Sequence, residues 1–327
     1  MARRSAVGAV ALALAIALAV ACTACTAGSA GSPGSAGGHP PGPASAGDAG
    51  PGVITVGSFD FPESVLLAYL YAGALSARGY PVRVLPDLGS RELVEPALMT
   101  GLVQLVPEYT GSALEFVSLG RVHATADVTA TAAALANRMA ARGIVTARPA
   151  AAQDANAIVV TGATASRYRL RTISDLARAA PRLVFGGPPE CPERPDCLPG
   201  LRRTYGLRFQ AFAGLDAGGP LTRQALEAGD IGAALLFTTD PAIRAGNLVE
   251  LADNRDLQPA ENVIPVLRRA TADRYGAGLL AALDAVSARL STAALTALNA
   301  QVQTNGRDPH AVARSWLRDQ GLGRGTS

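Results

Sequence analysis

Two aromatic side chains stand where strand-like segments run into helix-like segments. Tyr109 and Thr110 follow a short apolar run in "QLVPEYTGSALE", and Phe59 holds a similar place in "ITVGSFDFPES". In an open parallel sheet, the turns beyond the carboxyl ends of the strands form the ligand-binding crevice. Both turns are therefore candidates for a small-molecule site. Packing of Tyr109, with Thr110 as a helix N-cap, explains the same residues equally well.

The residues that would support catalysis are sparse. The three histidines, His39, His123 and His310, have neither metal-ligand spacing nor an acidic neighbour in the sequence to orient them. No G-x-S-x-G elbow, H-E-x-x-H motif or phosphate loop follows the N-terminal region. We therefore expect a binding protein with no catalytic residue, metal or cofactor. An extracytoplasmic enzyme remains the rival class.

The N-terminus predicts export. Residues 1–21 read "MARRSAVGAVALALAIALAVA", a basic start followed by an apolar run, which is typical of a secretory signal. Ala21 precedes Cys22, so we expect a lipoprotein anchored through Cys22 to the outer face of the cell membrane, with Cys25 as the rival acceptor. Residues 22–52 are rich in Gly, Pro, Ser and Ala and indicate a tether.

The remaining chain, from about residue 53 to 327, is long and apolar enough to bury a core. The sequence holds 29 basic and 26 acidic side chains, and removal of Arg3 and Arg4 with the signal leaves 27 against 26. No basic run stands out, so nucleic acid and anionic membrane surfaces are poor partner candidates.

Strand-like and helix-like segments alternate along this part of the chain. Pro62 lies in the first turn of a predicted helix that ends at Gly79, and Pro96 bends or interrupts the next one. This alternation favours an α/β fold with largely parallel sheets and helices on both faces. Strands are expected at 53–59, 80–86, 103–109, 156–161, 182–187, 231–237 and 261–268. Helices are expected at 62–79, 90–101, 126–143, 172–180, 198–206, 220–229, 272–290, 291–304 and 308–320.

Several colinear segments resemble the solute-binding proteins of osmoprotectant ABC importers, which bind glycine betaine, choline and carnitine. The segments are "ITVGSFDFPES", "VPEYTGSA", "TISDL", "GGPPECPERPDCLPGL", "YGL", "LDAGGPLT", "LLFTTD" and "LQPAENVIPVLR". The resemblance implies a two-lobed periplasmic-binding-protein clamshell (type II) whose chain crosses between the lobes twice. Lobe 1 would hold 53–155 and 264–327, and lobe 2 would hold 156–263. It also implies a monomer that works with ABC permease subunits.

The resemblance also implies a binding site. A quaternary ammonium has no N–H to donate and is best held by the faces of aromatic rings. By similarity, Tyr109 and Phe237 are cage walls, Ser112 takes the place of a threonine that donates to the ligand carboxylate, and Arg194 reads that carboxylate. The full expected set is Phe59, Tyr109, Thr110, Ser112, Asp154, Asn156, Arg194, Phe237 and Glu261.

This chain departs from the family pattern at three positions. Phe59 replaces a lysine, Asn156 replaces an aromatic residue, and Ala260 replaces a tyrosine. The family cage is therefore incomplete, although Phe59 could restore a ring and Asp154 or Glu261 could supply countercharge. We expect a quaternary-ammonium or related zwitterionic osmolyte. A different small polar solute, or a sensor that binds without delivering, is the alternative.

Two cysteines enclose the proline-rich segment "PERPD". In an exported chain we expect Cys191 and Cys197 to form a disulfide that holds Arg194 in place. Zinc binding is the alternative, but no second cysteine pair or histidine is near in the sequence. Capture between two lobes further predicts an open and a closed state whose balance the ligand shifts.

Overall fold

The computed structural model describes residues 52–246 and 248–323. The predicted signal segment, the tether and the candidate lipid acceptors Cys22 and Cys25 lie outside these residues. Within the described part of the chain, no single helix is long and apolar enough to cross a membrane, although one bent helix pair, Ala277–Ser287 with Thr292–Thr304, meets the length and composition criteria together.

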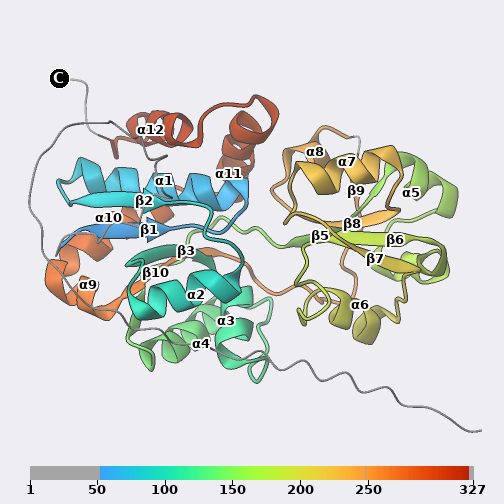
Figure 1. Cartoon of the computed structure of the whole chain (residues 1–327), viewed down its shortest axis with the longest axis horizontal. Coiled ribbons are helices and arrows are strands. Elements are labelled where there is room, and N and C mark those ends of the chain that lie inside the picture. Colours follow the sequence, from blue (N-terminus) through green and yellow to red (C-terminus); the bar gives the residue numbers. More distant parts are fainter. Residues whose placement is uncertain (1–51, 247, 324–327) are drawn as a thin grey trace, which may run out of the picture. The chain divides into compact units, whose positions relative to one another are not determined.

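Two five-stranded sheets organise the molecule (Figure 1). The first has the order β2-β1-β3-β10-β4 and the second the order β7-β6-β8-β5-β9. The strands of the first sheet are β1 (Ile54–Gly57), β2 (Val82–Leu85), β3 (Leu105–Tyr109), β4 (Ile144–Thr146) and β10 (Val263–Arg268). Those of the second are β5 (Asn156–Thr161), β6 (Val184–Gly187), β7 (Ala211–Gly214), β8 (Ala233–Phe237) and β9 (Leu248–Glu250).

Helices flank both sheets. We call the first sheet with α1–α4 and α9–α12 the first lobe, and the second sheet with α5–α8 the second lobe. The helices of the first lobe are α1 (Pro62–Ala77), α2 (Arg91–Thr100), α3 (Thr110–Ser118), α4 (Val128–Ala140), α9 (Arg269–Tyr275), α10 (Ala277–Ser287), α11 (Thr292–Asn299) and α12 (Pro309–Asp319). Those of the second are α5 (Gly162–Tyr168), α6 (Leu198–Tyr205), α7 (Pro220–Ala228) and α8 (Pro241–Arg244).

The strands that carry the chain between the lobes run antiparallel to their neighbours. β10 pairs antiparallel with β3, with Val263 opposite Tyr109, and β5 pairs antiparallel with β8, with Asn156 opposite Phe237. The expectation of largely parallel sheets is wrong at these strands, because each enters its sheet from the other lobe rather than through a helical crossover on the same sheet. An isolated antiparallel bridge between Gln153 and Asn262 joins the two crossing segments.

Two further sequence expectations need correction. The helix expected over 272–290 is divided into α9 and α10 at Gly276, whose φ of 69° lies in the left-handed region. The helix expected over 172–180 consists of two short 3₁₀ turns, Ile173–Arg178 and Ala180–Arg182. The alanine- and leucine-rich composition of 272–290 predicted one continuous helix. Gly276 instead adopts a backbone conformation that other residues avoid, and this divides the helix.

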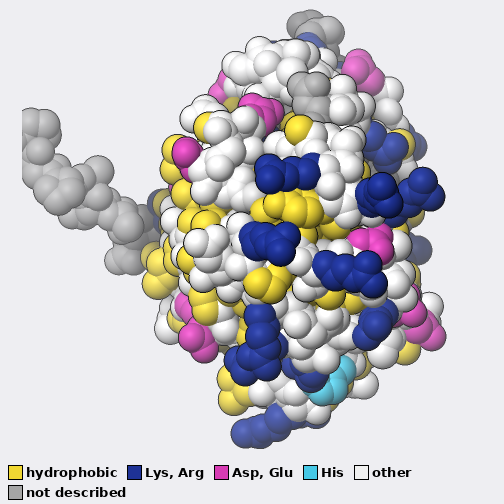
Figure 2. Space-filling model, turned by 90° about the vertical axis from the view of Figure 1, so that its right-hand side faces the viewer, with side chains coloured by type: hydrophobic (Ala, Val, Ile, Leu, Met, Phe, Trp, Pro, Cys, Tyr) yellow, Lys and Arg dark blue, Asp and Glu magenta, His cyan; other side chains and the backbone are white. Residues whose placement is uncertain are grey.

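Each sheet has its own hydrophobic core. In the first lobe, α1 is buried over most of its surface, and Leu66, Leu67 and Leu70 are inaccessible to solvent. The second sheet buries one apolar cluster on each face. Figure 2 shows the outer end of the second lobe, where several basic side chains share one face with apolar and acidic side chains. Each core stabilises its own sheet, and the two sheets position the loops that lie between them.

Candidate ligand-binding site

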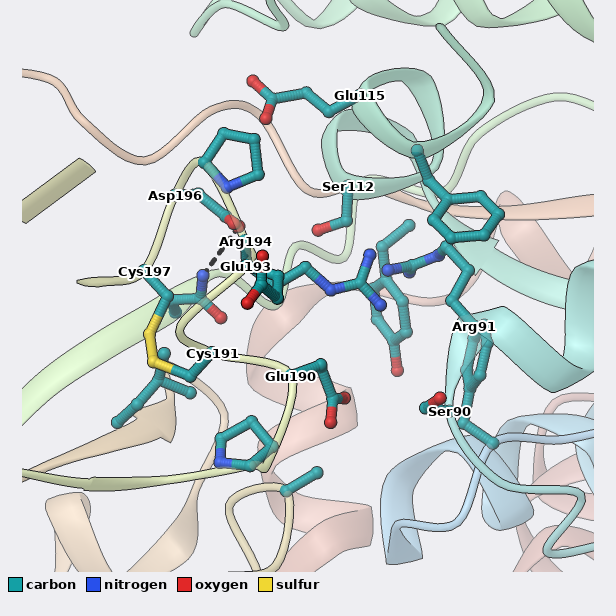
Figure 3. Close-up of a pocket in the computed structure, with 18 of the residues that line it drawn as sticks. Ser90, Arg91, Ser112, Glu115, Glu190, Cys191, Glu193, Arg194, Asp196 and Cys197 are labelled. Carbon is teal, nitrogen blue, oxygen red and sulfur yellow. Dashed lines mark hydrogen bonds between the residues drawn. A yellow bond between two sulfur atoms is a disulfide. The ribbon is translucent and has the colours of Figure 1, made fainter. Parts of the chain in front are cut away.

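A cavity of about 350 Å³ is lined by side chains from both lobes (Figure 3). The first lobe contributes the β1–α1 turn, the start of α2 and one side of α3. The second lobe contributes the loop between β6 and α6 and the end of β8. Of the nine residues expected from the sequence, eight line this cavity: Phe59, Tyr109, Ser112, Asp154, Asn156, Arg194, Phe237 and Glu261.

Four aromatic rings converge in the cavity, with Phe61 at their centre. Its ring centroid lies 5.8 Å from that of Phe59, 6.1 Å from that of Tyr109 and 5.3 Å from that of Phe237. Phe59 and Tyr109 are almost fully buried, whereas Phe61 and Phe237 are partly exposed. Phe61 was not among the residues predicted from the sequence, although it stands two residues after Phe59 in the same turn.

Local structure fixes the positions of these rings. The Phe59 N–H donates to Ser64 Oγ (2.9 Å), which shapes the β1–α1 turn, and Phe61 is the extended N-cap residue before Pro62. Phe237 packs against Gly218, where φ is +63° and a Cβ would lie 2.7 Å from the ring. A glycine is therefore required at 218 both for its backbone conformation and for the space that the ring occupies.

A buried carboxylate lies beneath the rings. The Tyr109 hydroxyl donates to Glu63 Oε1 (2.8 Å), and Thr239 Oγ1 donates to Glu63 Oε2 (2.5 Å). Asn299 on α11 donates to the same carboxylate. Burial, followed by the charge of Glu63, raises the pKa of Tyr109 well above its usual value, so the phenol stays protonated and donates. Glu63 thereby joins α1 to the segment after β8 in the second lobe.

Asp154 lies on the first crossing segment, next to Glu63. Its Oδ1 accepts the Thr239 N–H (2.9 Å) and the Thr238 hydroxyl (3.3 Å). Burial, followed by the charge of Glu63, raises the pKa of Asp154 well above its usual range. The charged form of Asp154 is therefore disfavoured by its surroundings.

Ser112 and Glu261 satisfy each other at the start of α3. Glu261 accepts the N–H groups of Gly111 (3.1 Å) and Ser112 (2.8 Å) and the Ser112 hydroxyl (2.5 Å). Burial raises the pKa of Glu261 to about 8. A Cβ at Gly111 would meet the Ala260 carbonyl oxygen at 2.9 Å, so a glycine permits this close approach of the chain.

Thr110 and Asn156 make protein contacts that the sequence did not predict. Thr110 does not line the cavity; its hydroxyl donates to the Ala260 carbonyl (2.8 Å) and accepts the Asn262 N–H (3.1 Å), which ties α3 to the second crossing segment. Asn156 Nδ2 donates to Asp196 Oδ2 (2.8 Å) and to Gln258 Oε1 (3.1 Å), and so supports the loop after β6.

Two arginines border the cavity. Arg194 lies within the loop closed by the Cys191–Cys197 disulfide, which confirms the predicted pairing. Arg91, which the sequence analysis missed, comes from the first residue of α2 and forms two hydrogen bonds with Glu108, each 2.9 Å long. Within residues 52–246 and 248–323, no group of three or more His, Cys, Asp or Glu side chains is arranged to hold a metal ion.

The sequence from residue 52 to 319 matches the family model described as the substrate-binding domain of an ABC-type glycine betaine transport system, OpuAC. The chain belongs to the OpuAC family. Members of this family are the extracytoplasmic solute-binding components of ABC importers, not enzymes, and they work with permease subunits. The resemblance stated from the sequence is thus confirmed.

Named relatives cover nearly the same region of the chain. The glycine-betaine-binding protein of Pseudomonas aeruginosa is 30% identical over 289 residues, which are 85% of this chain and 91% of the relative. The glycine betaine-binding protein YehZ of Escherichia coli is 26% identical over 277 residues, 82% of this chain and 90% of the relative.

Solved structures show the same architecture. A glycine betaine/carnitine/choline ABC transporter protein superposes with a TM-score of 0.65 at 21% identity, covering 82% of this chain and 99% of its own. Apo YehZ gives a TM-score of 0.59 at 26% identity, with the same coverage of both chains. The predicted two-lobed periplasmic-binding-protein fold (type II) is therefore confirmed for this OpuAC protein.

Proposed function

We propose that this protein captures a quaternary-ammonium osmolyte, of the glycine betaine or choline type, between its lobes and delivers it to an ABC permease. The observation that carries the proposal is the group of four aromatic rings, Phe59, Phe61 and Tyr109 from the first lobe and Phe237 from the second, above a buried carboxylate. We call this group the aromatic cluster. Ser112, Asp154, Asn156, Arg194 and Glu261 complete the proposed site.

The chemistry of the ligand suits this cluster. A trimethylammonium group has a permanent charge and no N–H, so it gains little from hydrogen-bond acceptors and most from ring faces. Each desolvated ring contributes roughly 0.5–2 kcal/mol to such a cation. The Glu63 carboxylate beneath Tyr109 adds an attractive charge without offering itself to the methyl groups, because Tyr109, Thr239 and Asn299 already donate to it. The names of the relatives, both glycine-betaine-binding proteins, support the same ligand class.

Calorimetric titration of the protein with glycine betaine, proline betaine, carnitine, choline and ectoine tests the proposal. We expect saturable binding of at least one quaternary ammonium. Phe61→Ala should weaken it by about tenfold, because the central ring is lost. Phe209→Ala is the matched control, since Phe209 stacks on Phe185 in the second core at a centroid distance of 4.6 Å, away from the cavity. It should lower stability and leave affinity unchanged.

Two results would contradict the proposed ligand class. One is the absence of binding by every member of the panel at millimolar concentration, which would point to a different polar solute. The other is an equal loss of affinity in Phe61→Ala and Phe209→Ala, which would indicate a general effect on folding. Hydrolysis of a bound compound would favour the enzyme class, and the absence of any uptake defect on deletion would favour a sensor.

The proposal includes a lipid anchor at Cys22. The lipoprotein-type signal before it supports this assignment. Cys22→Ala should abolish lipid labelling and release the protein from membranes, whereas Cys25→Ala should leave both unchanged. Labelling retained in the first variant and lost in the second would move the anchor to Cys25.

A further inference from the structure

Arg91, the first of the cavity's two guanidinium groups, is held by a protein carboxylate. Its Nε and Nη2 donate to the two oxygens of Glu108, and its Cζ lies 5.0 Å from the centroid of the Phe59 ring. The Glu108 side chain is fully buried and the Arg91 side chain is only 11% exposed. This paired fork geometry leaves the guanidinium without a need for a further anion.

Arg194, the second guanidinium, is engaged across the cleft. Its Nη2 donates to the Glu92 carboxylate (2.9 Å), and its Cζ lies 5.4 Å from the centroid of the Phe116 ring. Arg194 belongs to the second lobe, whereas Glu92 and Phe116 belong to α2 and α3 of the first. Ser90 donates to the same carboxylate (2.7 Å) and helps to orient it. Glu92 therefore occupies the place in which a ligand carboxylate would meet Arg194.

The remaining charges in the cavity disfavour an anionic group. Burial raises the pKa values of Asp154 and Glu261, which disfavours their charged forms. Besides these two, six acidic side chains share the cavity lining with the two guanidinium groups: Asp60, Glu92, Glu115, Glu190, Glu193 and Asp196. Figure 3 shows Glu190, Glu193 and Asp196 on the same loop as Arg194, so a second anion at this position would lie among carboxylates. Like charges that line one cavity repel a bound anion and raise its free energy.

We propose that this site selects cationic quaternary ammoniums that lack a carboxylate, such as choline, over zwitterionic betaines, and that Glu92 sets this preference by holding Arg194. The inference rests on the proposed function and specifies its ligand class. A betaine carboxylate must compete with Glu92 for the Arg194 guanidinium before it can take the paired fork geometry. A choline-type cation leaves that ion pair intact and benefits from the acidic surroundings.

Titration of the wild-type domain with choline and glycine betaine gives the first test, and we expect choline to bind at least about tenfold more tightly. Glu92→Gln should then strengthen glycine betaine binding by about tenfold and change choline binding less than about threefold, because Glu92 is half-exposed and solvent screens its charge. The ratio of the two affinities should approach unity.

Glu193→Gln is the matched control. It removes the same charge from the lining of the same cavity, next to Arg194 in the chain, but leaves the Arg194–Glu92 pair in place. It should shift the ratio of affinities much less than Glu92→Gln does, because it removes one nearby charge without freeing Arg194. A double-mutant cycle completes the design: in an Arg194→Ala background, Glu92→Gln should no longer change the ratio, because the group that Glu92 restrains is gone.

The outcomes separate the two proposals. If neither choline nor glycine betaine binds, the proposed function fails and this inference falls with it. If both bind and wild type prefers glycine betaine, the proposed selectivity is overturned while the proposed function stands. If Glu92→Gln leaves the ratio unchanged, only the role of Glu92 is overturned. Equal shifts in Glu92→Gln and Glu193→Gln would also overturn it, since net charge alone would then explain the selectivity.

Discussion

Replacement of Tyr109 by phenylalanine and by leucine separates its ring from its hydroxyl group. Tyr109 is 6% exposed, its ring centroid lies 6.1 Å from that of Phe61, and its hydroxyl donates to Glu63 at 2.8 Å. Tyr109→Phe keeps the ring and removes the hydrogen bond. Tyr109→Leu removes both while retaining an apolar side chain. The two variants therefore test binding and stability independently.

The expected magnitudes follow from this environment. A cation on a desolvated ring gains about 1–2 kcal/mol, so Tyr109→Leu should weaken binding of the preferred ligand by roughly tenfold. Tyr109→Phe leaves that face in place and should change affinity by less than about threefold. Both variants remove a donor from the buried Glu63, and a lost hydrogen bond to a charged group costs about 1.5–3 kcal/mol of unfolding free energy.

Calorimetry supplies the affinities, and urea denaturation without ligand supplies the unfolding free energies. Wild-type affinity in Tyr109→Leu, with reduced stability, would show that the ring is only a packing residue. An equal loss of affinity in both variants would refute the reasoning in another way. It would mean that the Tyr109–Glu63 bond, and not the ring face, controls binding.

Three other predictions concern the rest of the domain. Burial and the neighbouring Glu108 raise the pKa of Glu95 to about 8, so its contribution to stability is present below about pH 4.5 and is lost as pH rises towards 8. Glu95→Gln should flatten the pH dependence of the unfolding free energy over that range by about 5 kcal/mol, and parallel profiles for the two proteins would contradict this. The double variant Cys191→Ser and Cys197→Ser should lose roughly 2 kcal/mol of unfolding free energy, as expected for a short ring. If adding a reductant does not lower the unfolding free energy of the wild type, the disulfide does not contribute to stability and this prediction is wrong. Small-angle scattering should show compaction with saturating ligand, because the Arg194–Glu92 and Thr239–Glu63 bonds join the lobes. Identical scattering profiles with and without ligand would contradict a closing motion.

Much of the local structure was predictable from residues near in sequence. The apolar runs and Pro62 predicted β1, α1 and β3, and the proline-rich segment between two cysteines predicted the disulfide. These features depend on backbone preferences and short-range periodicity, which a single sequence displays. The two-lobed arrangement came from the family resemblance, since no periodicity reports that the chain leaves one sheet and later returns to it.

Only the tertiary structure decided which side chains meet. Phe61 became the centre of the aromatic cluster because the β1–α1 turn faces the end of β8, more than 170 residues later in the chain. Thr110 does not line the cavity because the segment just before β10, which runs beside β3, forms both hydrogen bonds with its hydroxyl. Arg194 meets Glu92 because the loop after β6 and the start of α2 line the same cavity. Partners distant in sequence are selected by strand order and lobe closure, and a side chain's own neighbours in the sequence carry no record of that choice.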